Sequence, residues 1–286
     1  MKVGLVLEGG SYRGLFTAGV LDIFMDENIQ VDGIVGVSAG ALFSPNYFSK
    51  QRGRVIRYTK RFCKDRRNMS LLSYFLTGNI VNRQFAFYDV TLKYDIFDNE
   101  TFIKNNTGFY VTATNVETGE AEYLQMQDII GDMEMLRATS AIPFFSKFVE
   151  VNGKYYLDGG VAESVPIRHV QSMGYDKIIV VLTRPYGEKK YELSKIMEYG
   201  LKLKYRKYPK LIEAFLKMYK HYNETLDYVN DLEQKGEIFV FRPSCKLPVS
   251  TVERNPDNLQ KAYDMGVCCC KENIEALKQF LKKNDV

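Results

Sequence analysis

The chain has 286 residues, of which 45% are hydrophobic, and a formal net charge of +4. This length can bury a substantial core, and this hydrophobic content excludes an intrinsically disordered protein. So small a net charge does not by itself indicate nucleic-acid binding, and we expect no nucleic-acid partner.

Two strand–turn–helix units are predicted in succession at the N-terminus. Residues 3–7 are apolar and end at a glycine-rich turn, and residues 13–27 follow with an approximate 3.6-residue apolar period. Residues 31–37 form a second apolar run that ends at Ser38, and a helix of small residues is expected from about Ala39. Repeated units of this kind indicate a parallel sheet with crossover helices, so we expect a three-layer α/β fold with a mostly parallel central sheet.

The middle of the chain predicts further strands and helices. Strands are expected at residues 109–115, 121–126, 154–157 and 177–182. The first two of these should pair around the turn at residues 117–120. Helices are expected at residues 50–76, where the pattern is amphipathic, and at residues 128–139.

The composition changes after Arg184 and Pro185 and becomes rich in Lys, Tyr and Leu. We predict mostly helix over residues 188–234, a strand at 237–241 and a long helix over 256–283. We therefore divide the chain into a first domain at residues 1–184 and a helix-rich C-terminal region at residues 185–286 that packs on it.

Residues 36–40 read GVSAG, which is a G-x-S-x-G motif. A serine on a sharp strand-to-helix turn needs small neighbours because a Cβ would clash there. The turn raises the Ser38 hydroxyl out of the sheet at a helix N-terminus, which favours negative charge during acyl transfer. The alternative is a tight turn whose serine only caps the helix. The position between a predicted strand and a predicted helix favours a nucleophile elbow.

Residues 8–14, EGGSYRG, form a second glycine-rich segment between a strand and a helix. A dinucleotide-binding loop would require G-x-G-x-x-G, and Ser11 stands in the place of its second glycine. In an oxyanion hole, adjacent backbone N–H groups hold the negative charge of a tetrahedral intermediate. The neighbouring unit with a candidate nucleophile favours the oxyanion hole. The plain alternative is a turn that uses glycine for packing alone.

A third motif is Asp158-Gly159-Gly160, which by itself is more often a simple turn. In this order, however, the three motifs resemble those of the patatin-like phospholipase family, particularly its bacterial members. The family carries a G-G-x-x-R-G loop, a G-x-S-x-G elbow and a later D-G-G or D-G-A, and residues 138–143 resemble its A-x-S-A-x-P segment. The resemblance covers about residues 3–183. Ser11 departs from the third glycine of many relatives, which keeps a backbone N–H but reduces the loop's freedom.

The resemblance implies a Ser38–Asp158 catalytic dyad without a histidine. Asp158 would accept the Ser38 proton and pass it to the leaving alcohol, with the oxyanion held by N–H groups of Gly10 and Ser11, and Gly9 as a further candidate. An ordinary aspartate is a weak base, so the site must be dry enough to raise the pKa of Asp158. The remaining motif positions are Arg13, Gly14, Gly36, Gly40, Gly159 and Gly160.

Two of these expectations have alternatives. Arg13 either orients the loop or attracts a phosphate, or it forms an ordinary surface salt bridge. A conventional triad would need a histidine, and the chain has two, His169 and His221. Neither lies in a glycine-flanked motif, and we expect both near the surface.

The implied function is hydrolysis of lipid esters through an acyl-enzyme, by a phospholipase, lysophospholipase or carboxylesterase. The alternative is a catalytically silent lipid-binding or scaffold protein of the same fold. We expect no cofactor and no metal, because the five cysteines have no usable ligand spacing: Cys63, Cys245, Cys268, Cys269 and Cys270. The sequence does not indicate an oligomeric state.

Basic residues gather in two segments that also contain many aromatic residues, 50–67 and 189–220. Near an anionic membrane each basic residue adds about 1 kcal/mol, so we expect peripheral contact with such a surface as the alternative to two solvated helix faces. No apolar run approaches the length of a transmembrane helix, and Glu8 ends the first apolar run too early for a signal peptide. Reduced cysteines would suit a cytoplasmic protein.

Overall fold

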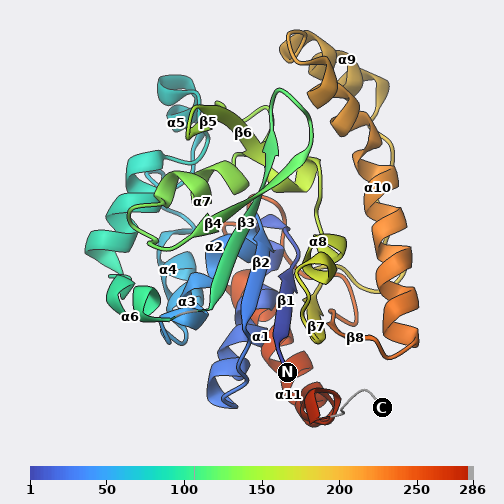
Figure 1. The fold of residues 1–286 in the computed structure, drawn as a ribbon. Helices are drawn as coiled ribbons and strands as arrows, with labels where there is room; N and C mark the ends of the chain where they lie inside the picture. Colours follow the sequence, from blue (N-terminus) through green and yellow to red (C-terminus); the bar gives the residue numbers. More distant parts are fainter. Residues whose placement is uncertain (106, 283–286) are drawn as a thin grey trace.

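The computed structural model describes residues 1–105 and 107–282. Its centre is a sheet with the strand order β5-β6-β3-β2-β1-β7-β8 (Figure 1). The parallel core consists of β1 (Val3–Leu7), β2 (Gly33–Val37), β3 (Gly108–Asn115), β7 (Lys177–Val181) and β8 (Ile238–Phe241). The predicted α/β fold with a mostly parallel sheet is therefore confirmed.

Antiparallel strands extend the sheet beyond β3. The predicted pair is present, because β4 (Ala121–Met126) runs antiparallel to β3. On the same side β6 (Lys154–Asp158) also pairs with β3, and β5 (Val149–Val151), which the sequence did not predict, closes the edge. This edge carries the predicted base, because Asp158 is the last residue of β6.

Helices cover both faces of the sheet, as the alternation of side chains along β1 requires. Leu5 and Leu7 pack into one cluster with α1 (Gly14–Asp26) and α11 (Pro256–Lys282). Val6 packs into another cluster with α8 (Ile167–Ser172) and α10 (Pro209–Gln234). The result is the three-layer arrangement expected from the sequence.

The helices α1 and α11 cross at close range because glycine lies at the contact in both. A Cβ on Gly19 would run into the backbone of α11 at Tyr263, and a Cβ on Gly266 would run into the backbone of α1 at Phe16. The predicted helix at residues 256–283 is confirmed as α11, except that Lys283 lies outside the described residues. The C-terminal region thus supplies both a strand of the sheet and part of a helix layer.

The prediction of one helix over residues 50–76 was wrong. The structure has α4 (Arg54–Phe62) and α5 (Leu71–Thr77), separated by a turn in which Arg67 pairs with Asp65. Basic residues continue through this turn, so the charge pattern does not indicate that the helix ends there. The predicted helix at 128–139 is also shorter, because the Asp128 carboxylate holds the N–H groups of a turn before α7 (Met133–Thr139).

The remaining elements are short segments around this core. Those after β2 are α2 (Ala39–Phe43), α3 (Pro45–Phe48), a π-helical segment η2 (Arg83–Tyr94) and α6 (Asn99–Lys104). The sequence predicted neither η2 nor α6. Before α10, residues Lys195–Lys204 form α9. Among the described residues, no helix combines the length and the apolar character needed to span a bilayer.

Candidate active site

Ser38 lies on a strained turn between β2 and α2. Its backbone has φ 50° and ψ −118°, a conformation that residues other than glycine rarely adopt. The turn leaves no room for larger neighbours. A Cβ on Gly36 would lie 2.8 Å from the Ala41 backbone, and a Cβ on Gly40 would lie 2.7 Å from the Leu7 carbonyl oxygen. Glycine is therefore required on both sides of Ser38.

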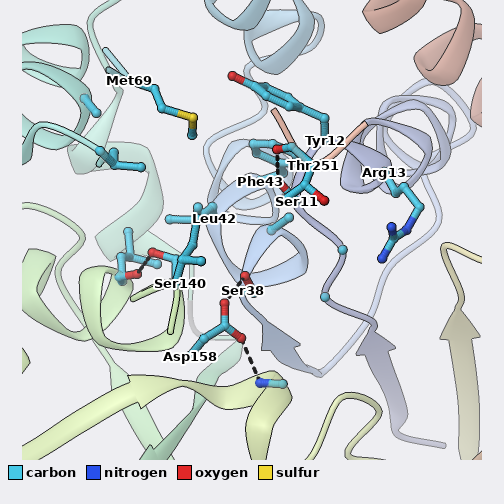
Figure 2. A pocket seen from close by; sticks show the side chains of 18 of the residues that line it. Ser11, Tyr12, Arg13, Ser38, Leu42, Phe43, Met69, Ser140, Asp158 and Thr251 are labelled. Carbon is cyan, nitrogen blue, oxygen red and sulfur yellow. Dashed lines mark hydrogen bonds between the residues drawn. The ribbon is translucent and has the colours of Figure 1, made fainter. Parts of the chain in front are cut away.

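The sheet brings Asp158 to Ser38 although 120 residues separate them in the chain. Strand β2 borders β3, and β3 borders β6, which ends at Asp158. The Ser38 hydroxyl donates a hydrogen bond of 2.6 Å to Asp158 Oδ2, and the Gly160 N–H donates one of 2.8 Å to Oδ1 (Figure 2). One carboxylate oxygen is thus fixed by the backbone and the other faces the serine.

The segment at residues 138–143 supports both members of this pair. The Thr139 hydroxyl accepts a hydrogen bond of 2.9 Å from the Ser38 N–H, and the Ala141 carbonyl accepts one of 3.0 Å from the Asp158 N–H. From its residues alone, this segment had no predicted role of its own. Its proximity to both residues explains why it accompanies the other motifs.

Burial changes the proton affinity of Asp158. Loss of solvent raises the pKa of its carboxyl above the ordinary aspartate range. Hydrogen bonds from Ser38 and Gly160 and the charge of Lys190 oppose this shift without reversing it. Asp158 is therefore a stronger base than an exposed aspartate, which is the property expected of a residue that removes a serine proton.

The glycine-rich loop after β1 lies beside the Ser38 turn because β1 and β2 are parallel neighbours. A Cβ on Gly9 would lie 3.2 Å from the Ser38 Cβ, and a Cβ on Gly14 would lie 2.7 Å from the Ala39 Cβ. A Cβ on Gly10 would lie 2.7 Å from the Thr183 hydroxyl. The two turns are packed as closely as glycine allows.

Ser11 adopts the conformation that the missing glycine would favour, with φ 52°. Its hydroxyl donates a hydrogen bond of 2.8 Å to the Thr251 carbonyl and so points away from Ser38 (Figure 2). The Ser11 hydroxyl thus bonds to Thr251, and the backbone N–H of Ser11 is the group that we consider near Ser38.

Glu8, which the sequence analysis treated only as the end of an apolar run, anchors this loop. It is 1% exposed, and its carboxylate accepts hydrogen bonds from the Thr183 N–H and hydroxyl and, at 2.7 Å, from the Tyr222 hydroxyl. A charged residue between a buried strand and a glycine pair was the available sequence signal. Tyr222 lies on α10, so the C-terminal region supports the loop directly.

Lys190 is a second residue that the sequence did not indicate. Its ammonium group donates a hydrogen bond of 2.9 Å to the Ser164 hydroxyl, which donates one of 3.0 Å to the Gly160 carbonyl. It also lies 4.1 Å from the Tyr222 ring centre. Burial lowers the pKa of Lys190 to about 8. This cation is therefore linked, through the turn at residues 158–160, to the carboxylate that faces Ser38.

Arg13 lies apart from Ser38 and Asp158 in the same region (Figure 2). Its buried Nε has no hydrogen-bond partner within residues 1–105 and 107–282. Burial and the neighbouring Arg184 lower the pKa of its guanidinium group. The residue as a whole is partly exposed although its Nε is buried, so the role of Arg13 stays a prediction.

The two histidines do not approach Ser38. His169 is half-buried on α8, and its ring stacks on Tyr123 with a centroid separation of 3.4 Å. Burial lowers the pKa of His169. His221 is exposed on α10. In the described part of the chain, neither is among the residues that line the cavity at Ser38.

A cavity of about 680 Å³ opens beside Ser38 and Asp158. Most of the side chains that enclose it are apolar. They come from α4, η2, α7 and the C-terminal helices and include Phe62, Phe87, Val90, Leu136, Met197 and Phe215. Within the described ranges, no three His, Cys, Asp or Glu side chains are grouped to bind a metal ion. The site therefore combines one serine–carboxylate pair with an apolar chamber.

Comparisons with known proteins define the class of this chain. The patatin-like phospholipase family matches residues 5–170, which is more than half of the chain and includes all three motifs. The chain belongs to this family. A second family, a domain of unknown function (DUF6363), matches residues 208–282, which contain α10, β8 and α11.

Particular relatives come from bacteria and fungi. The uncharacterized protein YjjU of Escherichia coli K12 is 29% identical over 189 residues, covering 64% of this chain and 52% of that protein. The lysophospholipase NTE1 of Meyerozyma guilliermondii is 28% identical over 195 residues, covering 63% of this chain and 12% of that protein. The matched region thus spans about half of the bacterial relative and a small part of the fungal one.

One solved structure, VipD from Legionella pneumophila, aligns over 96% of this chain and 67% of its own chain. Its TM-score is 0.48 and its sequence identity is 12%.

Proposed function

We propose that this protein is a lipid acyl hydrolase that uses Ser38 as nucleophile and Asp158 as general base and acid. The observation that carries the proposal is the 2.6 Å hydrogen bond from the Ser38 hydroxyl to a buried Asp158, placed at the wall of an apolar cavity. Membership of the patatin-like phospholipase family supports the same reading.

In the acylation step, Asp158 Oδ2 takes the hydroxyl proton while Ser38 Oγ bonds to the ester carbonyl carbon. The tetrahedral intermediate collapses when the bond from carbon to the alcohol oxygen breaks, and the protonated Asp158 gives its proton to that oxygen. The products of this step are a Ser38 acyl ester and a free alcohol. Asp158 acts first in its ionised form and then in its protonated form. A raised pKa suits this double role because it makes both forms accessible.

In the deacylation step, water occupies the place of the departed alcohol. Asp158 takes one proton from the water as its oxygen bonds to the acyl carbon, and the proton then returns to Ser38 Oγ as that bond breaks. A fatty acid leaves and the enzyme is restored. The Gly160 N–H holds Oδ1 throughout, so the proton moves on Oδ2 alone.

The negative charge of each intermediate requires hydrogen-bond donors next to Ser38. The backbone N–H groups of Gly10 and Ser11, with Gly9 as a further candidate, are the donors we assign. Support comes from the packing of this loop against the Ser38 turn and from its anchoring through Glu8 and Thr183. Glycine permits the close approach that an oxyanion hole needs.

The substrate class we favour is a lipid with one long acyl chain. Most of the side chains that line the cavity are apolar, and its size lies within the range of small-molecule pockets. The fungal relatives are named lysophospholipases, which favours a lysophospholipid over a soluble ester.

Fatty acid release from lysophosphatidylcholine, measured by mass spectrometry, tests this function. The wild-type chain should release the acid, Ser38→Ala should not, and a double variant with His169→Asn and His221→Asn should retain most of the rate. Thermal unfolding should show that all three are folded. A folded Ser38→Ala variant with near wild-type release would refute the proposal, and loss of activity in the histidine variant would refute the dyad.

A further inference from the structure

The short helix α5 presents its apolar side chains to solvent. Leu71, Leu72, Phe75 and Leu76 are all exposed, and Phe75 retains 80% of its accessible surface. The buried residue of this helix is instead Ser73, whose hydroxyl donates a hydrogen bond of 2.9 Å to the Asn79 carbonyl. A soluble helix normally has the opposite arrangement, with its apolar stripe on the core.

The helix α9 carries a similar exposed stripe. Ile196, Tyr199 and Leu203 follow each other at spacings of three and four residues and share one face. Ile196 retains 85% of its accessible surface, while Leu201 on the opposite side is fully buried. Within the described residues, α9 therefore packs through Leu201, while Ile196, Tyr199 and Leu203 stay exposed to solvent.

One carbonyl group joins these two helices. The Phe144 oxygen accepts a hydrogen bond of 3.2 Å from Tyr74 on α5 and one of 2.7 Å from Lys204 on α9. The neighbouring Phe145 is exposed, and its ring lies 6.1 Å from that of Tyr74. Figure 1 shows α5 and α9 at the end of the molecule opposite the N-terminus.

We call these exposed side chains together the apolar rim. It comprises Leu71, Leu72, Phe75, Leu76, Phe145, Ile196, Tyr199 and Leu203. The rim borders the cavity at Ser38: Phe145 belongs to both, and Phe144 and Met197, which adjoin rim residues in the chain, also line the cavity. A molecule bound at the rim therefore lies next to the cavity that we assign to an acyl chain.

The charge beside the rim is positive. Residues 195–208 contain five basic residues and one acidic residue, Glu198, which pairs with Lys202. On the basic helix α4, by contrast, Arg54 is buried, and both Arg54 and the exposed Arg57 pair with Asp95. The expectation that this helix contacts a membrane stays a prediction, and buried Arg54 is not available for such a contact.

We propose that the apolar rim inserts into the surface of a lipid bilayer that contains anionic lipid, so that a lipid molecule passes from the membrane into the cavity. The proposal rests on the proposed lipid hydrolase function. Three observations carry it: α5 and α9 both present apolar side chains to solvent, both donate a hydrogen bond to the Phe144 carbonyl, and Phe145 and Met197 beside them also line the cavity. A shallow apolar surface flanked by basic residues has the composition of an interfacial membrane contact.

Flotation of the full chain with vesicles tests the inference. Wild-type protein should bind mixed phosphatidylcholine and phosphatidylglycerol vesicles. The variants Leu72→Ser with Phe75→Ser, and Ile196→Ser with Tyr199→Ser, should each lower the partition coefficient about tenfold or more, since burial of one large apolar side chain alone contributes this much free energy. None of these four residues lines the cavity, so hydrolysis of soluble p-nitrophenyl butyrate should be unchanged.

A matched control removes exposed apolar residues elsewhere: Ile96→Ser with Ile103→Ser should leave vesicle binding unchanged. The inference is overturned if wild-type protein does not bind vesicles, if the rim variants bind as wild type does, or if light scattering shows a dimer that the rim variants dissociate. Vesicle binding without any hydrolysis would instead refute the proposed function and leave the membrane contact standing.

Discussion

Ser11 and Ser38 occupy matching places in two neighbouring strand–turn–helix units, yet their surroundings differ. Each follows a parallel strand and precedes a helix, and each has a positive φ, 52° for Ser11 and 50° for Ser38. The Ser38 hydroxyl donates to Asp158, whereas the Ser11 hydroxyl donates to the Thr251 carbonyl. The backbone conformation is shared, and the partner of the side chain is not.

The order of strands in the sheet explains this difference. Strand β2 borders β3, which in turn pairs with β6, so a carboxylate reaches Ser38. Strand β1 borders β2 and β7, and at the end of β7 Thr183 holds Glu8 and the glycine loop. One hydroxyl thus faces a carboxylate, as the proposed dyad requires, while the other turn belongs to the loop to which we assign the oxyanion donors.

Replacing each serine with alanine should give the largest difference in rate between the two turns. Ser38→Ala removes the nucleophile and Asp158→Asn removes the base, so each should lower kcat/KM for p-nitrophenyl butyrate by about 10⁴-fold or more. Ser11→Ala keeps the backbone N–H and should change the rate by less than about tenfold. Comparable losses for Ser11→Ala and Ser38→Ala, in folded proteins, would mean that the two serines do not have different roles.

Substitutions at Gly10 should separate the N–H group from the space around it. Gly10→Pro removes one N–H, and loss of an oxyanion donor typically costs about 10²–10³ in rate. Gly10→Ala keeps the N–H and adds a Cβ 2.7 Å from the Thr183 hydroxyl, so its loss should be smaller. The measurement is kcat for the same ester. Equal rates for both variants would place the oxyanion elsewhere.

Replacing Lys190 should shift the pH dependence of the rate. Asp158 acts as a base when ionised, so kcat/KM falls as pH drops through its pKa, which burial raises. Charged Lys190 lowers the pKa of Asp158, and the Lys190→Met variant should therefore move this acid limb to higher pH. The two profiles should converge above pH 8, where Lys190 with its pKa of about 8 loses its charge.

The neighbouring lysine is the matched control for this profile. Lys189 is exposed and lies 3.8 Å from Asp227, so Lys189→Met should leave the acid limb in place. An acid limb that moves equally in both variants, or moves in neither, would contradict the coupling of Lys190 to Asp158.

The smallest expected effect is on the anchor of the glycine loop. Tyr222→Phe removes the donor to buried Glu8 and should lower the free energy of unfolding by about 1–3 kcal/mol, measured with urea. Tyr228→Phe, which removes a donor to the less buried Gln171, should cost less. Equal losses in the two variants would show that Glu8 does not depend on the C-terminal region.

Local motifs predict part of this site. The glycines around Ser38 and the turn at Asp158 are short patterns, so their residues could be predicted, and the sheet then brought them together. Glu8 and Tyr222 could not be paired in this way, because 214 residues separate them and only the packing of α10 joins them. Lys190 could not be predicted either, because only the packing of the chain brings it to Ser164.

The fold was predicted best where apolar patterns are strong. The strands of the parallel core are continuous buried runs, whereas the turn between α4 and α5 carries the same basic residues as the helix before it. Helix α5 was not predicted as a separate element because the sequence pattern does not mark the turn before it. Periodicity reports which face is apolar, but only the structure shows whether protein or solvent lies against it.

Covalent labelling with a fluorophosphonate tests the central claim, that Ser38 is the activated serine of the two. Peptide mass spectrometry of the labelled wild-type chain should place a single adduct on Ser38 and none on Ser11. Asp158→Asn should greatly slow the labelling. An adduct on Ser11, or labelling of Ser38 at the same rate with and without Asp158, would contradict the account.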